Sequence, residues 1–379
     1  MKTTHLFILC VLLILCNACK KNKDDDDPSY MNEEIGKGYL TVLPIDEDDF
    51  YLFVNLGHQN PPGHVFPSGH GGFYLTDYMQ TSNVYSPGNL FITQIVRLEH
   101  VTAGIQDYTL KLSSPQGRLN ITFGHLSSID SSILAKAPSF DGSECETYMA
   151  GGNDYHMCIV WTNIEVSAGD IIATGGGLPG QFGVDFGVYD KKRPVKFVHN
   201  RWADYDYGYA VSPLDYFTSE ITEILTPLCG DYVCGSRNIR TIDPIGGTIE
   251  YDSTGTLQGL WYKPDHFGDS EDYHISFVFD NTQPWIPVIC WGISVPGSTP
   301  GVYTFDTENS GIVNRKFVDV VPDGNIYRYE IKDECSNNPP ENSMLLIQLI
   351  HSDTLKLETQ QPSAGPPWNF TDSAVYFIR

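Results

Sequence analysis

Glycine and proline recur so often in this chain that long regular helices are disfavoured over most of its length. The 379 residues include 35 glycines and 24 prolines, and 12% of the residues are aromatic. Glycine and proline destabilise helix interiors and favour turns, whereas aromatic residues are enriched in β-strands. The composition therefore predicts a mostly β protein in which many short strands are joined by tight turns.

Alternation of apolar and polar residues marks individual strands in the second half of the chain. Tyr273, Ile275, Phe277 and Phe279 form an apolar series with mostly polar residues between them. A period of two is typical of a half-buried strand. Residues 343–359 show the same period on both sides of a Ser-Asp pair, so we expect a β-hairpin there.

One helix is predicted, over residues 213–226. Ser212 can cap its first turn, apolar residues follow at helical spacing, and a proline and a glycine lie just after its end. The chain is long enough for two hydrophobic cores, since 41% of its 379 residues are hydrophobic. We therefore expect a first β domain at residues 33–200 and a second all-β domain, a sandwich or barrel-like fold, at 236–379. The helix would lie in a connector over residues 201–235.

The N-terminal segment has the features of an export signal. The apolar run Phe7–Leu15 is too short to span a bilayer as a stable helix, so residues 1–18 indicate a cleaved signal peptide. An alanine followed by Cys19 resembles a lipoprotein cleavage site, which implies lipid attachment at Cys19. Residues 19–32 carry a run of aspartates that resembles the surface-export tag of some outer-membrane lipoproteins, although a solvated spacer gives the same pattern. We expect an exported protein, lipid-anchored to the outer membrane and exposed at the cell surface.

The charge balance argues against one class of partner. The chain carries 47 acidic and 23 basic residues, which gives a formal net charge of -24 at pH 7. This excess of negative charge would repel a nucleic-acid backbone, so nucleic acid is not expected as a partner.

Six further cysteines follow Cys19, namely Cys145, Cys158, Cys229, Cys234, Cys290 and Cys335. An even number in an oxidising compartment favours disulfides, but the sequence leaves their pairing open. The local pairs Cys145/Cys158 and Cys229/Cys234 are the simplest expectation. The spacing of Cys229 and Cys234 could instead belong to a zinc site, but no second Cys or His pair lies at a matching spacing.

Two segments of the first half resemble a known enzyme family. VSAGDIIATGGG (Val166–Gly177), followed by FGVDFG (Phe182–Gly187), is similar to the end of lysostaphin/LytM-type zinc peptidases, where a glycine-rich loop leads to a strand with the motif H-x-H. The segment FGHL (Phe123–Leu126) resembles the Tyr-x-His-Leu segment of the same family. The resemblance implies a LytM-like antiparallel β-sandwich for the first domain, with an insertion at residues 131–165.

The metal site of that family is only partly preserved in this sequence. The H-x-H positions are Gly183 and Asp185, and the other catalytic histidine of the family corresponds to His125. The first family motif, His-x3-Asp, falls in a stretch with three histidines, none of which has an aspartate four residues later. The resemblance therefore implies a rewritten ligand set of His64, His70 and Asp185, with His125 in a catalytic role. Zinc would suit such a set best, although carboxylate ligands also suit manganese or calcium.

Each of these residues also has a simpler interpretation. His125 could be a half-buried histidine bonded to the backbone, and His64 and His70 could be exposed in a loop rich in proline and glycine. Asp185 could end a strand or cap a turn. Gly183 cannot transfer a proton, so hydrolysis would need a substitute that the sequence does not identify.

Three functions remain open on this basis. The favoured hypothesis is a divergent, non-hydrolytic LytM-like domain that binds peptide, peptidoglycan or another glycan, with no metal or with a divalent metal ion. The second is a working metal-dependent hydrolase of the peptidase type that uses the rewritten His/Asp set. The third is a carbohydrate-binding or adhesin-type surface lipoprotein whose β domains are scaffolds for functional loops.

Overall fold

The computed structural model describes most of the chain and divides it into two compact units. The described residues are 28–150, 153–267, 270–362 and 365–379. The first unit is Met1–Glu34, which holds the 3-10 helix η1 (Pro28–Asn32), and the second is Ile35–Arg379. The predicted signal peptide and the predicted lipid attachment site at Cys19 lie outside the described residues.

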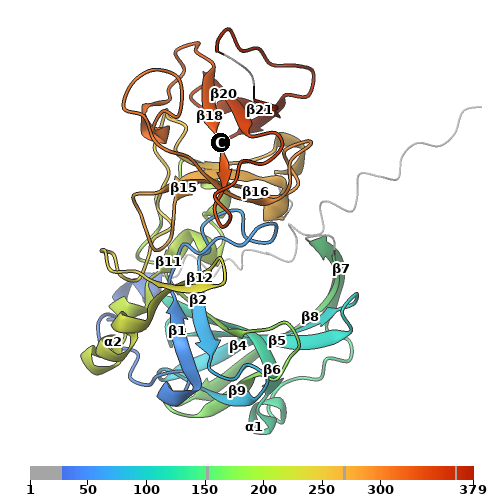
Figure 1. Cartoon of the computed structure of the whole chain (residues 1–379). Helices are drawn as coiled ribbons and strands as arrows, with labels where there is room; N and C mark the ends of the chain where they lie inside the picture. The colour runs from blue at the N-terminus through green and yellow to red at the C-terminus, as the bar shows by residue number, and fades with distance from the viewer. Residues whose placement is uncertain (1–27, 151–152, 268–269, 363–364) are drawn as a thin grey trace, which may run out of the picture. The chain divides into compact units, whose positions relative to one another are not determined.

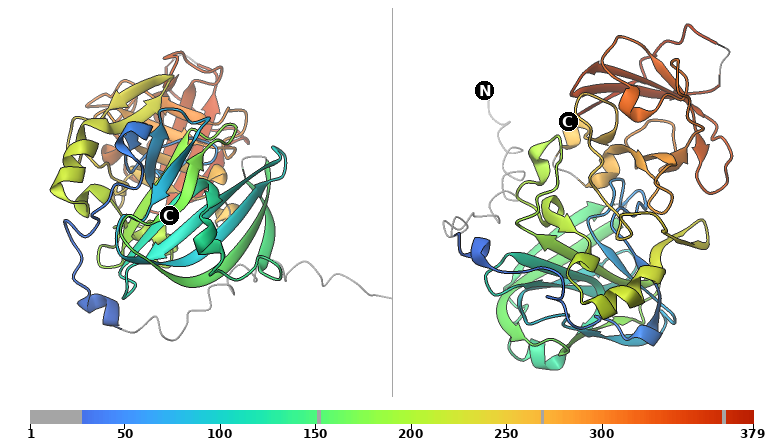
Figure 2. Two further views of the ribbon diagram at one scale, coloured as in Figure 1. Left: turned by 90° about the horizontal axis from the view of Figure 1, so that it is seen from below. Right: turned by 90° about the vertical axis from the view of Figure 1, so that its left-hand side faces the viewer.

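A 13-stranded sheet forms the first half of the second unit (Figure 1). Its strands are β1 (Phe50–Val54), β2 (Gly71–Leu75), β3 (Thr81–Tyr85), β4 (Leu90–His100), β5 (Ile105–Ser113), β6 (Leu119–Ile129), β7 (Glu144–Ala150), β8 (Asn153–Val166), β9 (Ile171–Gly176), β10 (Gly183–Asp190), β11 (Ala210–Val211), β12 (Cys229–Val233) and β13 (Ser236–Ile239). The hydrogen-bonded order is β13-β12-β1-β2-β10-β6-β5-β4-β8-β7, with β11 on β10 and with β9 between β3 and β6. The strands β1 and β12 run parallel, whereas β10 is antiparallel to both of its neighbours, β2 and β6. Figure 2 shows the twist of these strands, coloured blue to yellow, from two further sides.

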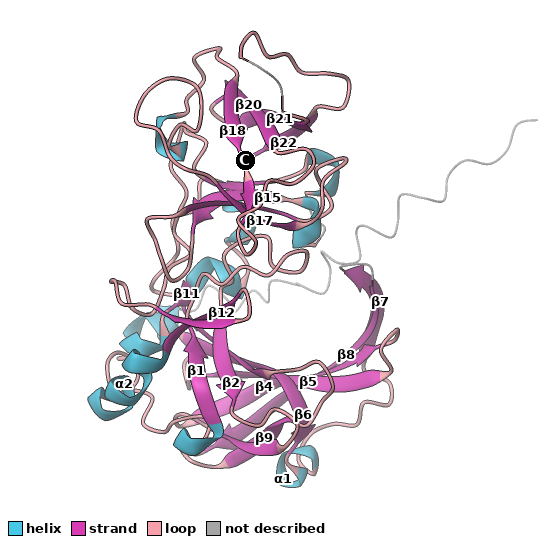
Figure 3. Ribbon diagram, viewed as in Figure 1, coloured by secondary structure: helices cyan, strands magenta, loops and turns pink. Residues whose placement is uncertain are grey.

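Two smaller antiparallel sheets form the second half of this unit (Figure 3). One contains β14 (Gly259–Trp261), β15 (Ile275–Phe279), β16 (Pro287–Trp291), β17 (Gly301–Thr304) and β19 (Lys332–Asp333). The other contains β18 (Tyr327–Glu330), β20 (Met344–His351), β21 (Thr354–Gln360) and β22 (Val375–Ile378). The helices of the second unit are short: α1 (Ser131–Leu134), α2 (Ser219–Leu225), η2 (Glu47–Asp49), η3 (Asn200–Trp202), η4 (Asp206–Tyr209), η5 (Pro213–Asp215), η6 (Thr226–Leu228), η7 (Pro264–His266), η8 (Glu271–Tyr273) and η9 (Phe317–Asp319).

The predicted mostly β fold is confirmed, and so are the two strand signals of the second half. The hairpin predicted at residues 343–359 is formed by β20 and β21. The alternating series around Phe277 forms β15, but its polar face is buried as well. Ser276 is fully buried, and its hydroxyl donates to the carbonyl of Val65 at 2.7 Å. This strand is therefore covered on both faces, where alternation alone predicts one exposed face.

The helix predicted over residues 213–226 is interrupted. Ser212 caps only the short η5, and Thr218 starts α2 by accepting a hydrogen bond from the amide of Ile221. The backbone between the two helices hydrogen-bonds to another segment: the amide of Leu40 donates to the carbonyl of Tyr216 at 3.0 Å. Carbonyls used in such a contact are withdrawn from the helical hydrogen-bond pattern.

The predicted insertion at residues 131–165 is part of the main sheet. It contains α1, β7 and nearly all of β8, and β8 pairs with β4 along the length of β4. The predicted disulfide Cys145–Cys158 is confirmed and joins β7 to β8. The expected pair Cys229/Cys234 is wrong. Cys234 is bonded to Cys335, while Cys229 is buried as a free thiol.

Five phenylalanines lie at the centre of the core beneath the main sheet. The rings of Phe53 and Phe73 are 5.0 Å apart, those of Phe73 and Phe186 are 5.7 Å apart, and those of Phe186 and Phe123 are 5.0 Å apart. Phe217 closes the group at 5.9 Å from Phe186. All five are at most 1% exposed, so this face of the sheet is fully committed to packing.

A second core, drawn from residues 257–377, packs the two smaller sheets together. A further buried cluster joins Val65 and Phe66 of the first half to Tyr262 and Val278 of the second half. The domain boundaries at residues 200 and 236 stay predictions. No helix among the described residues is both long enough and apolar enough to cross a membrane.

Candidate functional site

A strip of glycines leaves one aspartate standing on the face of the main sheet opposite the phenylalanine core. Gly72 of β2 and Gly124 of β6 lie directly across from Asp185 of β10, one on each side. Directly paired residues point to the same face of a sheet, and successive residues alternate between faces. Phe73, Phe123 and Phe186, which are next to these three positions in the chain, therefore point into the core. The opposite face carries the Asp185 side chain, and the residues paired with Asp185 on both flanking strands are glycines, which have no side chain.

Strands β2 and β10 approach each other so closely at two glycines that no residue with a Cβ atom fits there. A Cβ atom added at Gly72 would lie 2.7 Å from the carbonyl oxygen of Val184, and one at Gly183 would lie 2.2 Å from the carbonyl oxygen of Phe73. Both contacts are with backbone, which cannot move aside without shifting a strand. Glycine is thus required by the packing at both positions, which explains part of the sequence pattern.

A β-bulge places His125 beside Asp185. Strand β6 has two residues, Gly124 and His125, opposite the single residue Thr109 of β5. His125 takes a φ of 57°, the left-handed conformation that side chains other than glycine rarely adopt. Bulges redirect side chains and are common next to functional sites. The strained backbone at His125 is the local cost of directing its imidazole over the glycine strip.

His125 is held between two carboxylates. Its Nδ1 lies 2.8 Å from Oδ2 of Asp107, which is 2% exposed, and its Nε2 lies 3.4 Å from Oδ2 of Asp185. Burial alone would lower the pKa of His125, but the carboxylates of Asp185 and Asp107 outweigh burial and raise it to about 9. His125 is therefore a cation at neutral pH, with Asp185 as one of its counter-ions.

Three more histidines, His58, His64 and His70, lie near His125 and Asp185 and come from the loop between β1 and β2. The Nδ1 of His58 lies 2.7 Å from Oδ2 of Asp231 in β12. Burial lowers the pKa of His58, but Asp231 outweighs it and the pKa is raised overall. The Nδ1 of His70 lies 3.2 Å from the carbonyl oxygen of Gly71, which leaves its Nε2 available for another partner.

His64 differs from the other three histidines of the cleft in that its buried Nδ1 has no partner among the described residues. Its ring lies 5.3 Å from that of His70. Burial and the neighbouring His70 lower the pKa of His64 to about 3. It is therefore a neutral imidazole with an unused nitrogen, which is unusual for a buried polar group.

These side chains line one cleft of about 240 Å³, which we call the histidine cleft. Its lining consists of Val54, His58, Asn60, His64, Ser68, His70, Gly71, Gly72, Tyr74, His125, Gly180, Gln181, Phe182, Gly183, Val184 and Asp185. Asp185 and His125 are each about a third exposed, at 35% of their side-chain surface. A dissolved ligand can therefore reach both.

Two aromatic side chains, Tyr74 and Phe182, belong to the lining of the cleft, and Tyr232 and Tyr78 pack against them; we call these four residues the aromatic rim. The rings of Tyr74 and Tyr232 are 6.3 Å apart, and those of Tyr78 and Phe182 are 4.9 Å apart. Phe182 is 54% exposed and Tyr232 is 43% exposed. Large aromatic rings left in water beside a polar cleft are typical of binding sites.

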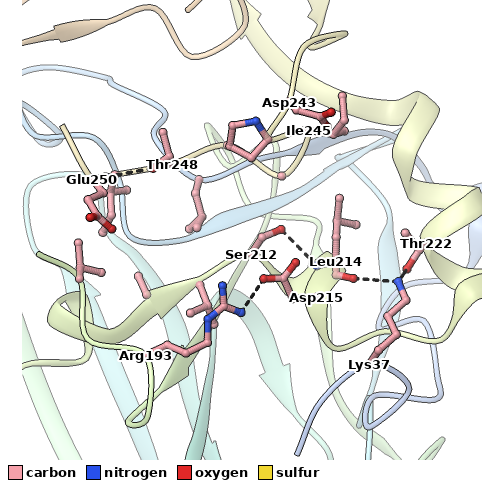
Figure 4. Close-up of a pocket in the computed structure, with 18 of the residues that line it drawn as sticks. Lys37, Arg193, Ser212, Leu214, Asp215, Thr222, Asp243, Ile245, Thr248 and Glu250 are labelled. Atoms are coloured by element: carbon pink, nitrogen blue, oxygen red, sulfur yellow. Dashed lines mark hydrogen bonds and ion pairs between the residues drawn. The ribbon is translucent and has the colours of Figure 1, made fainter.

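A larger hollow of about 700 Å³ lies elsewhere in the second unit, and its basic side chains Lys37 and Arg193 already have partners (Figure 4). The Nη1 of Arg193 lies 2.6 Å from Oδ2 of Asp215. The Nζ of Lys37 donates to the carbonyl of Leu214 at 3.1 Å and to the hydroxyl of Thr222 at 2.5 Å. The histidine cleft, in contrast, holds an unused imidazole nitrogen and an accessible ion pair, so it is the better candidate for function.

The residues of the cleft fit a metal site in kind but not in arrangement. His64, His70 and Asp185 are suitable ligand types, and the free Nδ1 of His64 is a potential donor. Among the described residues, however, the groups of three whose donor atoms lie within 4.8 Å of one another do not include this set. The two groups that do meet this distance contain Cys145, Cys158, Cys234 and Cys335, all of which are disulfide-bonded.

The cleft brings together all four site residues proposed from the sequence within the described part of the chain, His64, His70, His125 and Asp185. Their roles as metal ligands and as a catalytic group stay predictions. Sequence reasoning missed two partners, Asp107 and Asp231. Asp107 lies 18 residues before His125, and Asp231 lies 173 residues after His58. No sequence signal links either aspartate to its histidine, because both contacts depend on how the strands pair.

Comparison with known proteins adds little to this description. No protein-family model matches this sequence, and no curated protein matches it. A solution NMR structure of lysostaphin is similar to this chain at 13% sequence identity and a TM-score of 0.24. The match covers 70% of this chain and 89% of lysostaphin. A TM-score of this size does not establish a common fold.

Proposed function

We propose that this protein is an exported, surface-anchored lipoprotein whose histidine cleft binds peptide or cell-wall glycan without hydrolysing it. The domain would be a divergent relative of the LytM-type peptidases. Three features support the proposal: the motif resemblance around Asp185, the protonated His125 beside Asp185, and the aromatic rim.

The contact between His125 and Asp185 carries the argument. Zinc-dependent hydrolysis needs a metal with an open position and a group that moves a proton beside it. Asp185 stands at a position that corresponds to a metal ligand in the family, but its charge is balanced by the His125 imidazolium at 3.4 Å. A protonated His125 cannot act as a base, and Gly183 has no side chain to replace it. The groups present therefore favour an ion pair over a hydrolytic centre.

The aromatic rim supports the class of ligand. Sugar rings and peptide side chains present apolar faces that pack on aromatic rings, while their polar groups need hydrogen-bond partners. Phe182 supplies an exposed ring in the cleft lining, and Tyr232 supplies another exposed ring beside Tyr74. The floor supplies the imidazoles and the carboxylate of Asp185, so both kinds of contact are available within one cleft.

Binding to insoluble peptidoglycan tests the proposal. The mature chain is incubated with purified peptidoglycan, the bound fraction is measured by sedimentation, and soluble fragments are measured in the supernatant. We expect retention without fragment release. The double variant Phe182→Ala and Tyr232→Ala is expected to weaken retention about tenfold, since a buried aromatic contact is typically worth about 1 kcal/mol or more. The matched control is Tyr376→Ala, which removes a tyrosine that is 47% exposed on β22.

Two outcomes would contradict this proposal. Release of soluble fragments that stops when a chelator is added would show hydrolysis. No retention on peptidoglycan, together with retention on an unrelated polysaccharide, would favour the adhesin-type function instead.

A metal-dependent hydrolase is the second candidate, and the unused Nδ1 of His64 is the observation that favours it. His64, His70 and Asp185 would hold the ion, which would polarise a peptide carbonyl and activate water. The test is metal content after purification in buffers with zinc, manganese or calcium. Near-stoichiometric metal in the wild type that is lost in both Asp185→Ala and His70→Ala would replace the first proposal with this one.

The proposed anchoring has its own test. Cys19→Ser is expected to abolish incorporation of a labelled fatty acid and to move the protein out of the membrane fraction. Protease added to intact cells is expected to degrade the wild-type protein if it faces outward. Fatty-acid labelling that persists in Cys19→Ser would exclude Cys19 as the attachment site.

A further inference from the structure

A second, much smaller cavity lies behind His58. It measures about 10 Å³ and is lined by Gly57, Gln59, Asp231, Val233, Asp280, Asn281, Val302 and Glu334. A space of this size holds one water molecule or one ion and nothing larger. Three of the lining residues are carboxylates, and none of the described lining residues is lysine or arginine. Burial and the neighbouring Asp280 raise the pKa of Glu334 to about 8, because the wall offers these carboxyl groups no basic side chain.

Asn281 presents an unused oxygen in this cavity. The residue is 6% exposed, and its Nδ2 donates to Oδ2 of Asp231 at 3.2 Å. Because a carboxylate only accepts, this contact fixes which end of the amide carries the nitrogen. The opposite atom, Oδ1, is buried without a hydrogen-bond partner among the described residues. It lies beside Gly57, where an added Cβ would be 3.1 Å away.

A buried oxygen without a hydrogen-bond partner costs about 1–3 kcal/mol of stability. We therefore expect Asn281 Oδ1 to contact a bound molecule or ion. That partner must fit a space of about 10 Å³ and must favour contact with oxygen and with several carboxylates. We propose that the cavity is a binding site for a divalent cation of the calcium type, held by Asn281 Oδ1 together with the carboxylates of Glu334, Asp280 and Asp231. Calcium binds carboxylate and amide oxygens in a flexible geometry, which suits this mixed set better than the strict octahedron of magnesium.

A disulfide joins the segments that carry two of these ligands, Asp231 and Glu334. Asp231 lies in β12, three residues before Cys234, and Glu334 immediately precedes Cys335. The disulfide Cys234–Cys335 joins the two segments across a sequence separation of 101. Glu334 and Asp280 are already hydrogen-bonded to each other, but the three carboxylates do not form a group within 4.8 Å among the described residues, so cation binding requires a side-chain rotation.

The cation site and the histidine cleft share one carboxylate. Oδ2 of Asp231 accepts from Asn281 at 3.2 Å and contacts Nδ1 of His58 at 2.7 Å. Asp231 orients His58 in the cleft, so a cation that binds to Asp231 also affects the position of His58. Cation binding in the small cavity is independent of what the histidine cleft binds.

Calorimetric titration of the chelator-treated mature chain with calcium chloride tests the site. We expect one saturable equivalent per chain and a rise in the thermal unfolding temperature with calcium. Glu334→Gln keeps the shape of the side chain and removes its charge, and it is expected to weaken calcium binding about tenfold or more. The matched control, Glu341→Gln, makes the same change at an exposed residue and is expected to bind as the wild type does.

Terbium luminescence gives a second measurement that does not rely on variants. Terbium bound in place of calcium is expected to luminesce on excitation of nearby aromatic residues, and calcium is expected to displace it. Absence of saturable binding in the wild type by both methods would overturn the proposal and would leave the cavity to a water molecule. Equal calcium affinity in the wild type and in Glu334→Gln, with both folded by circular dichroism, would also overturn it.

Discussion

The two ends of strand β10 carry aspartates in opposite surroundings. Asp190, at the end of the strand, is fully buried, and its carboxylate accepts from Arg118 at 2.9 Å and 2.7 Å and from the hydroxyl of Tyr216 at 2.7 Å. Asp185, near the start, is 35% exposed and meets His125 at 3.4 Å, which is longer than a normal hydrogen bond. Strand β10 thus carries two carboxylates: the oxygens of Asp190 are occupied by internal hydrogen bonds, whereas those of Asp185 can accept further ones.

This difference separates a structural carboxylate from one that is available to a ligand. Burial opposes ionisation of Asp190, but Arg118 outweighs burial and holds the pKa of Asp190 below its usual value. Its contacts are all internal, so no dissolved ligand can use them. Burial opposes ionisation of Asp185 as well, and His125 lowers the pKa of Asp185 in spite of it, yet the oxygens of Asp185 face an open cleft. Charge alone does not distinguish the two aspartates, whereas the number and length of their contacts do.

Replacing Asp190 with asparagine is expected to have the largest effect on stability. The asparagine side chain would keep the shape of the aspartate but would leave the charge of Arg118, which is 11% exposed, without its counter-ion. Breaking a buried pair typically costs about 3–5 kcal/mol, because one charge stays buried and unpaired. Urea denaturation of Asp190→Asn measures this loss. A loss below about 1 kcal/mol would show that the Asp190 end of the strand is not structural.

Adding a methyl group to the glycine strip is expected to have the next largest effect. In Gly183→Ala the new Cβ meets the carbonyl oxygen of Phe73 at 2.2 Å, so a strand must shift. Overpacking of this kind costs about 1–3 kcal/mol of the free energy of unfolding. Gly124→Ala is the matched control, because its Cβ meets the movable Oδ2 of Asp185 at 3.0 Å. It is expected to cost less stability and to displace Asp185, so equal losses in the two variants would refute the close-approach explanation.

The ion pair at the Asp185 end gives a stability contribution that depends on pH. The pKa of His125 rises from 6.5 to about 9 on folding, so its contribution is complete below pH 6.5 and is lost as the pH rises through 9. His125→Asn, which tolerates the left-handed backbone, is expected to cost on the order of 1 kcal/mol at about pH 6 after discounting for solvent screening. That difference is expected to shrink by about pH 10, as measured by urea denaturation. The exposed His351→Asn serves as the control and is expected to show no such trend.

The Asp190 end is expected to respond at the opposite end of the pH range. Because the pKa of Asp190 is held below 3.8, its contribution is complete above pH 3.8 and is lost only as the pH falls through the folded-state value. A stability difference between wild type and Asp190→Asn that disappears at alkaline pH would contradict the comparison of the two ends.

Asp185→Asn is expected to have the smallest effect on stability. Exposed or half-exposed ion pairs contribute at most about 1 kcal/mol, so the urea midpoint should change little. Retention on peptidoglycan is expected to fall, because the substitution removes the accessible carboxylate, which is also one of the two counter-ions of His125. Unchanged retention with unchanged stability would show that Asp185 takes no part in binding.

Local patterns in the sequence predicted the elements that depend on neighbouring residues. The hairpin of β20 and β21 follows from alternation, and the Cys145–Cys158 disulfide joins adjacent strands only 13 residues apart. The presence of His125 and Asp185 in one cleft followed from the order of motifs in the family resemblance. In each of these cases the information lies within a segment or in the order of a few segments.

The errors concern contacts that only the pairing of distant segments can create. Cys229 points into the core of the main sheet, where it is fully buried, so it could not reach Cys234. The predicted helix fails because the chain at Leu40 uses the carbonyl of Tyr216. The bulge at His125 adds one residue to β6 opposite Thr109, and such a residue has no periodic signal in the sequence.

The bridge from Cys234 to Cys335 also determines how the protein breaks. A protease nick anywhere between residues 235 and 334 leaves both fragments attached through the two sulfur atoms. Cleaved molecules would therefore migrate as an intact chain on a gel until a reducing agent separates them. A single cleavage in this segment could then pass unnoticed on a gel run without a reductant.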